Sequence, residues 1–119
     1  MQKKYVIGLD YGTLSGRAVI VDCENGKVLA ASVKNYEHGV INENLPTGEK
    51  LPGGDWALEV PEDYIDVLIT TVKEAIEKAK VSKRDIIGIG LDFTSCTILP
   101  VDEKNIPLCS SERFKVEKE

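Results

Sequence analysis

The sequence predicts an α/β protein built on a mixed β-sheet, and three observations support this fold class. Three β-type segments follow one another near the start of the chain with short turns between them, which is typical of an antiparallel meander. A long amphipathic pattern over residues 61–80 then predicts one helix. An apolar segment at 85–93 follows. Because a helix joins it to the meander, we expect this strand to run parallel to one of the three, by preference the first.

The three strands of the meander are predicted over residues 4–10, 17–22 and 27–36. A turn rich in Gly, Thr and Ser separates the first two. The sequence "ENGK" at 24–27 indicates a tight turn before the third strand, because Asn-Gly tolerates positive φ.

Residues 37–60 form a long loop with several prolines and glycines and no regular period. Loops of this length in a small domain are usually functional or disordered. Trp56, the single tryptophan, lies near the end of the loop. Two interpretations stay open: the ring anchors the loop on the core, or it lines a pocket.

The predicted helix begins at Pro61 and has Glu62 and Asp63 in its first turn, where the helix dipole favours acids. Its apolar side chains recur at three- and four-residue spacing: Ile65, Leu68, Ile69, Val72, Ile76 and Ala79. The segment 85–93 lacks polar alternation, which predicts a central strand covered on both faces. A further strand is predicted at 96–101.

Composition bounds the function classes. The 119 residues are enough for one modest domain, with 42% apolar and 29% charged residues. A net charge of −5 and the lack of a basic stripe argue against a nucleic-acid scaffold. No apolar run approaches the ~20 residues of a membrane span. Three widely spaced cysteines (Cys23, Cys96 and Cys109) argue against a disulfide framework or zinc site and fit reduced thiols. We therefore expect a soluble cytoplasmic protein that does not bind membranes.

The turn in "GLDYGTLSGRAVIVD" is the first candidate site. Asp10 ends a strand, and ligands of open α/β sheets gather at the carboxyl ends of strands. Gly12 and Gly16 permit unusual dihedral angles and close approach. Backbone N–H groups of Gly12 and Thr13, with those of Leu14 and Gly16, would form a concave anion site.

Hydroxyl groups of Thr13 and Ser15 add hydrogen-bond donors to this turn, and Arg17 suits a phosphate or a carboxylate. Asp10 would repel a phosphate unless a hard cation such as Mg²⁺ lies between them. The alternative is a Gly-rich hairpin in which Asp10 only forms the turn. The pattern is neither a Walker loop nor a dinucleotide fingerprint.

A second candidate site repeats this layout in "GIGLDFTSCTILPVD", where Asp92 ends an apolar strand and small polar residues follow it. If the two strands are neighbours, both carboxyl ends open into one cleft. Asp92 and Ser95 would then hydrogen-bond a hydroxylated substrate; the alternative is that Asp92 caps local N–H groups. Cys96 is interpreted as a small buried hydrophobe rather than a nucleophile. His38, in the long loop, is not expected to be catalytic.

The opening segment resembles the FGGY carbohydrate kinases, whose first strand and turn read D-x-G-T-x-S-x-R. Asp10, Gly12, Thr13 and Arg17 match this motif, with Ser15 before an inserted Gly16. The later blocks "HGVIN", "LPGGDWALEVPEDYIDVL" and "IIGIGLDFTSCTILPVD" are similar to the L-ribulokinase branch of that family. The likeness spans nearly the whole chain.

The resemblance implies an RNase H-like fold of the actin-type ATPases. It also implies phosphorylation of the O5 hydroxyl of L-ribulose, with ATP and Mg²⁺, in arabinose use. Carried over by position, Asp10 would be the Mg²⁺-linked acid. Gly12, Thr13, Ser15 and Arg17 would serve the ATP phosphates. Asp92, Thr94, Ser95 and Cys96 would lie at the sugar.

Family members are several times longer than this chain, which ends in a charged tail. We therefore expect residues 1–119 to be the amino-terminal part of the first kinase lobe, truncated within the domain. The catalytic base and the adenosine pocket are expected outside the chain, so the isolated piece should be inactive. Two alternatives stay open: another pentulose kinase of the family, or a non-catalytic binding or dimerising module. An unpaired edge strand would favour a homodimer.

Overall fold

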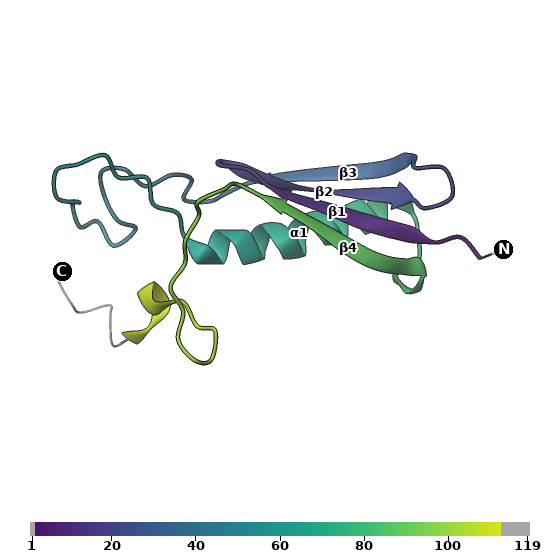
Figure 1. The fold of residues 1–119 in the computed structure, drawn as a ribbon. Helices are drawn as coiled ribbons and strands as arrows, with labels where there is room; N and C mark the ends of the chain where they lie inside the picture. Colours follow the sequence, from purple (N-terminus) through teal and green to yellow (C-terminus); the bar gives the residue numbers. More distant parts are fainter. Residues whose placement is uncertain (1, 113–119) are drawn as a thin grey trace.

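The computed structural model describes residues 2–112 and contains a four-stranded mixed sheet with one long helix across one face (Figure 1). The main elements are β1 (Tyr5–Tyr11), β2 (Ser15–Asp22), β3 (Val28–Asn35), α1 (Pro61–Ala79) and β4 (Ile86–Phe93), with two 3₁₀ turns, η1 (Lys83–Asp85) and η2 (Leu108–Ser110). The strand order is β3-β2-β1-β4, with β1 antiparallel to β2 and parallel to β4. The predicted meander, crossover helix and parallel fourth strand are confirmed.

Local sequence explains both ends of α1. Pro61 occupies the first turn, where its missing N–H leaves no hydrogen bond unmade, and Glu62 and Asp63 follow it. The helix ends because Lys80 adopts a left-handed conformation (φ 55°) and its N–H donates to the carbonyl of Glu77.

The core lies between α1 and the first two strands. It consists of Tyr5, Ile7 and Leu9 from β1, Ala18 and Ile20 from β2, and Ala75 from α1. The helix stripe that is fully buried runs through Val67, Thr71 and Ala75. Ile65 and Ile69 share the apolar spacing that predicted the helix, but they fall outside this stripe and are 57% and 60% exposed.

The prediction that the fourth strand is covered on both faces was also wrong. In the described residues β4 lies at the edge of the sheet, and α1 packs mainly on β3 and β2, so the helix covers little of β4. Leu91 and Phe93 are consequently 63% and 68% exposed. Apolar composition alone did not reveal that the covering layer stops short of this strand.

The predicted strand at 96–101 is absent from the described residues. Cys96 adopts a left-handed backbone conformation (φ 63°), which interrupts an extended chain, and Pro100 has no N–H for a ladder. Only an isolated bridge between Val101 and Pro107 remains.

Trp56 neither anchors the long loop on the core nor lines a described pocket. Its indole nitrogen donates to the carbonyl of Pro52 (2.7 Å), its ring lies against Gly54, and its side chain is 40% exposed. The ring therefore organises the loop itself.

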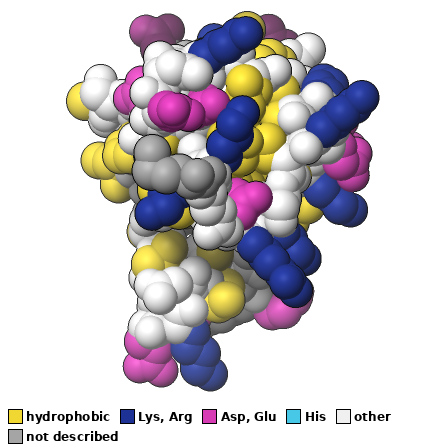
Figure 2. Space-filling view, turned by 90° about the vertical axis from the view of Figure 1, so that its right-hand side faces the viewer, with side chains coloured by type: hydrophobic (Ala, Val, Ile, Leu, Met, Phe, Trp, Pro, Cys, Tyr) yellow, Lys and Arg dark blue, Asp and Glu magenta, His cyan; other side chains and the backbone are white. Residues whose placement is uncertain are grey.

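Charges of both signs are mixed on the molecular surface. Figure 2 shows Lys and Arg side chains interspersed with Asp and Glu on the end of the molecule where the chain starts. Within residues 2–112, no helix is long and apolar enough to cross a membrane.

Candidate functional site

Two aspartates lie side by side at the carboxyl ends of the parallel strands. Asp10 of β1 and Asp92 of β4 are paired in the sheet register. Leu9 is buried on the helix side, so strand alternation places Asp10 on the opposite face of the sheet. The expectation that the two strand ends meet is confirmed.

The turn after β1 is a tight hairpin. The N–H of Gly12 donates to the carbonyl of Ser15 (2.8 Å), and Thr13 and Leu14 form an exposed tip. The Gly12 N–H, which was predicted to bind an anion, is thus already hydrogen-bonded within the turn. Thr13 and Leu14 are the exposed part of this turn.

Gly12 and Gly16 do not adopt positive φ, so the turn does not need glycine for an unusual dihedral angle at these positions. Gly16 is required for space instead. A Cβ at this position would lie 2.4 Å from a methyl group of Val67, so only glycine lets α1 approach β2 this closely.

Arg17 connects the turn to Asp10. Its Nε lies 3.5 Å from an Asp10 carboxylate oxygen, and its Nη2 donates to the Ser15 hydroxyl at 3.4 Å. Both charged side chains are roughly half exposed, so this ion pair orients the groups more than it stabilises the fold. Asp92 also accepts a hydrogen bond from the N–H of Phe93 (3.0 Å).

The carboxylate groups at this edge of the sheet are suitable ligands for a magnesium ion. Mg²⁺ usually binds through one or two carboxylates, with waters and phosphate oxygens as its other ligands. Asp10 and Asp92 offer two neighbouring carboxylates on the same face of the sheet. In this respect the residues present suit the predicted cation.

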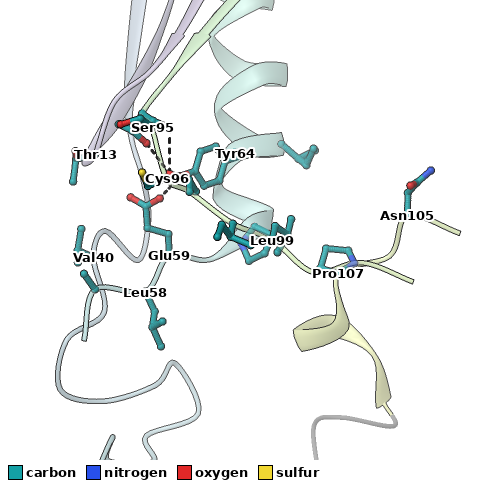
Figure 3. Close-up of a pocket in the computed structure, with 16 residues that line it drawn as sticks. Thr13, Val40, Leu58, Glu59, Tyr64, Ser95, Cys96, Leu99, Asn105 and Pro107 are labelled. Atoms are coloured by element: carbon teal, nitrogen blue, oxygen red, sulfur yellow. Dashed lines mark hydrogen bonds between the residues drawn. The ribbon is translucent and has the colours of Figure 1, made fainter. Parts of the chain in front are cut away.

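A cavity of about 900 Å³ opens on the other side of the hairpin tip, next to the start of α1 (Figure 3). It is lined by Thr13 from the turn, by Thr94, Ser95 and Cys96 after β4, by Glu59, Pro61 and Tyr64 around the helix start, and by apolar side chains that include Val40, Leu58 and Leu99. The structure thus brings Thr13 together with three of the predicted sugar residues. The lining does not include Asp10, Gly12, Ser15, Arg17 or Asp92.

Cys96 is exposed, so the interpretation as a buried hydrophobe was wrong. Its left-handed backbone turns the chain sharply after β4. Thr94 and Thr97 close this turn through a hydrogen bond between their hydroxyl groups (2.9 Å).

Three tyrosines connect the hairpin to the helix start. The ring centroid of Tyr64 lies 5.2 Å from those of both Tyr11 and Tyr36. The Tyr36 hydroxyl donates to the carbonyl of Gly12 (2.7 Å), and the Tyr11 hydroxyl donates to the carbonyl of Tyr64 (3.1 Å). Burial, and next the charge of Glu59, raises the pKa of Tyr36 to about 12, so this hydroxyl remains a donor at neutral pH.

His38 and Asp63 fasten the long loop to α1. Both the backbone N–H and the Nδ1 of His38 bond the Asp63 carboxylate, at 3.0 and 2.8 Å. Ligand atoms of these residues and Glu37 lie within 4.8 Å of one another. Because both Asp63 oxygens already accept hydrogen bonds from His38, we interpret the cluster as a structural latch.

Sequence reasoning missed Glu59 and the tyrosine cluster. Glu59 lies in a block that resembles the family, but that resemblance assigned it no role, and Tyr36 and Tyr64 meet because β3 ends near the start of α1. No local signal in the sequence distinguishes them from ordinary surface and core residues.

The residues 5–115 match the model of the N-terminal domain of the FGGY family of carbohydrate kinases. The chain belongs to the FGGY family of carbohydrate kinases. This result agrees with the motif at Asp10 to Arg17, and the fold agrees as well.

Curated relatives named "Ribulokinase" are similar over almost the entire chain. The protein of Geobacillus thermodenitrificans is 54% identical over 115 residues, and that of Halalkalibacterium halodurans is 50% identical over 115 residues. In both cases the match covers 97% of this chain and 20% of the relative. The chain therefore spans about a fifth of the length of these kinases.

Solved sugar kinases share the fold. A gluconate kinase from Lactobacillus acidophilus superposes with a TM-score of 0.69 at 23% identity, covering 89% of this chain and 18% of that one. A xylulose kinase from the same organism gives a TM-score of 0.68 at 23% identity, covering 88% and 18%. The mixed sheet with its crossover helix is thus an arrangement found in sugar kinases.

Proposed function

We propose that this chain forms the amino-terminal part of the first lobe of a cytoplasmic kinase that transfers phosphate from ATP to the O5 hydroxyl of L-ribulose. The observation that carries the proposal is the pair of neighbouring sites at one end of the sheet. Asp10 and Arg17 lie on one side of the hairpin tip, and the cavity with Thr94, Ser95 and Cys96 lies on the other. The names of the similar relatives supply the choice of sugar.

In this proposal the hairpin tip faces both reactants. Thr13 lines the cavity and also belongs to the turn that the D-x-G-T motif assigns to phosphate. Asp10 would hold Mg²⁺, and the ion would offset the negative charge of the nucleotide phosphates. Arg17 keeps the Asp10 carboxylate oriented, and Ser15 and Gly12 hold the turn in shape.

The hydroxyl groups of the sugar would meet Thr94, Ser95 and Cys96 at the cavity wall, whereas Asp92 lies outside the cavity lining, next to Asp10. A base that accepts the O5 proton would come from outside residues 1–119, as would the adenosine pocket. Phosphoryl transfer depends on positioning both reactants, so we propose that the 119-residue chain alone does not turn over.

The first experiment measures ADP release with L-ribulose and ATP, using the complete kinase and, separately, the 119-residue chain. The complete kinase should turn over and the chain alone should not. In the complete kinase, Asp10→Asn should lower kcat at least about 100-fold, as expected for loss of a charged group at the transferring phosphate. Its unfolding midpoint should stay close to wild type, because Asp10 is half exposed.

Wild-type kcat in the Asp10→Asn variant would remove Asp10 from the metal site. Faster turnover with another ketopentose than with L-ribulose would favour a different pentulose kinase.

The exposed strand β4 supports one alternative, a module that dimerises. Ile87, Ile89, Leu91 and Phe93 are all more than half exposed along one edge strand of the described sheet. A light-scattering mass of two chains for the 119-residue protein would support this homodimer, and a monomeric mass would exclude it.

A further inference from the structure

Glu59 is the only charged side chain among the described residues that line the cavity. It is half-buried, and Figure 3 shows its carboxylate rising from the helix start towards Cys96. The neighbouring backbone fixes its place. Leu58 exchanges two hydrogen bonds with Ile41 (2.7 and 2.9 Å), and Pro61 starts α1 two residues after Glu59.

Tyr64 holds one oxygen of the Glu59 carboxylate. The Tyr64 hydroxyl donates to Oε2 of Glu59. Burial, and then the hydrogen bond to Glu59, raises the pKa of Tyr64, so the hydroxyl keeps its proton and remains the donor. Among residues 2–112 the carboxylate accepts no other hydrogen bond, although a carboxylate has lone pairs for several.

The support under Tyr64 is rigid. Its ring packs against Tyr11 and Tyr36, both at 5.2 Å between centroids, and Tyr36 is in turn bonded to the hairpin through Gly12. Rings packed in this way lose little further freedom when a ligand binds. The orientation of the Glu59 carboxylate is therefore set before any ligand arrives.

A fixed carboxylate in a cavity with no cationic lining residue has a definite ligand preference. It accepts strong, charge-assisted hydrogen bonds from hydroxyl groups. It also repels a second carboxylate held beside it, because like charges in a partly desolvated site are costly. The hydroxyl groups of Thr94, Ser95 and Thr97 also line the cavity and add neutral polar contacts of the kind a polyol makes.

We propose that Glu59 is a specificity-determining residue that selects neutral polyhydroxylated ligands and rejects sugar acids in this cavity. Its free carboxylate oxygen accepts a ligand hydroxyl, and Tyr64 is the positioning residue that orients it. This inference rests on the proposed function, because it assumes that the cavity is the sugar site.

The test uses Glu59→Gln in the complete kinase, with Tyr64→Phe as a second variant and Glu77→Gln as the matched control. Glu77 lies on the exposed side of α1 near its end, so its substitution makes the same chemical change far from the cavity. Equilibrium binding of L-ribulose is measured by calorimetry without ATP, and KM is measured for L-ribulose and for ATP separately. Unfolding midpoints establish that each variant is folded.

Glu59→Gln should weaken L-ribulose binding about 10-fold or more, the usual loss for a hydrogen bond to a charged group. The KM for ATP should not change. Binding of a five-carbon aldonate should weaken less than that of L-ribulose, or improve, because the repelling charge is gone. Tyr64→Phe should weaken L-ribulose binding by a smaller factor, and Glu77→Gln should bind as wild type does.

Equal loss for the aldonate and the neutral sugar would overturn the role in selectivity, and unchanged L-ribulose binding in Glu59→Gln would overturn the proposal as a whole. A wild-type protein that binds L-ribulose through Glu59 but does not phosphorylate it would refute only the proposed function. A wild-type protein that binds no neutral sugar would refute both.

Discussion

Gly16 shows how one side chain sets the distance between a helix and a strand. A Cβ at this position would lie 2.4 Å from Val67, which is fully buried and cannot move aside freely. We predict that Gly16→Ala lowers the free energy of unfolding by about 1–3 kcal/mol, the usual cost of overpacking. Urea unfolding of the 119-residue chain measures this change.

Gly90→Ala is the matched control for Gly16. A Cβ at Gly90 has no atom within 4 Å, and the residue lies in the exposed strand β4. This variant should unfold within about 0.5 kcal/mol of wild type or be slightly more stable, because alanine restricts the unfolded chain. Equal losses at both positions would show that the approach of α1 to β2 does not require a glycine.

Single residues also show where sequence reasoning succeeded at the site and where it stopped. Thr13, Thr94, Ser95 and Cys96 could be predicted to meet, because two strand ends with small polar residues become neighbours in a parallel pair. Glu59 could not be predicted, since its place depends on the path of a loop that only the three-dimensional structure shows. The roles assigned to Asp10, Arg17 and Asp92 stay predictions.

The long loop and α1 behave as connected elements through His38 and Asp63. The hydrogen bond to Asp63, more than any other cause, raises the pKa of His38. The folded protein therefore binds the imidazole proton more tightly than the unfolded chain. The resulting stabilisation is complete below the unfolded pKa of about 6.5 and is lost as the pH rises through the higher folded value.

We predict that the difference in unfolding midpoint between wild type and His38→Gln is larger at pH 6 than at pH 9. Denaturant unfolding across this range, with both proteins in the same buffers, cancels the titration of other groups. In an Asp63→Asn background the difference should no longer depend on pH. A difference that stays constant with pH in the wild-type background would show that the latch does not require a charged imidazole.

The helix and the first strands could be predicted from the sequence pattern, but the elements that pack against them could not. The helix begins where Pro61 and its acidic neighbours indicated, and β1 to β3 lie close to the segments predicted from β-type residues and turn signals. The covering of β4 could not be predicted, because an apolar strand has the same composition whether its faces are covered or exposed. The prediction of a strand at 96–101 was wrong because Cys96 adopts a left-handed backbone conformation, which interrupts an extended chain.

The described part of the chain places two kinds of chemistry around one hairpin. The carboxylates of Asp10 and Asp92 lie on the sheet face away from α1, whereas the cavity lies at the start of α1. Among the described residues, the tip around Thr13 lines the cavity and closely follows the end of β1, where Asp10 lies. In a kinase, the phosphate to be transferred has to lie between the two reactants, and we propose that this tip meets that requirement.

A crystal structure of the complete kinase with Mg²⁺ and a non-hydrolysable ATP analogue provides the decisive observation. The terminal phosphates should lie against the tip formed by Thr13 and Leu14, with the ion linked to Asp10 directly or through water. A triphosphate bound far from this hairpin, in crystals where the nucleotide is fully occupied, would contradict the assignment.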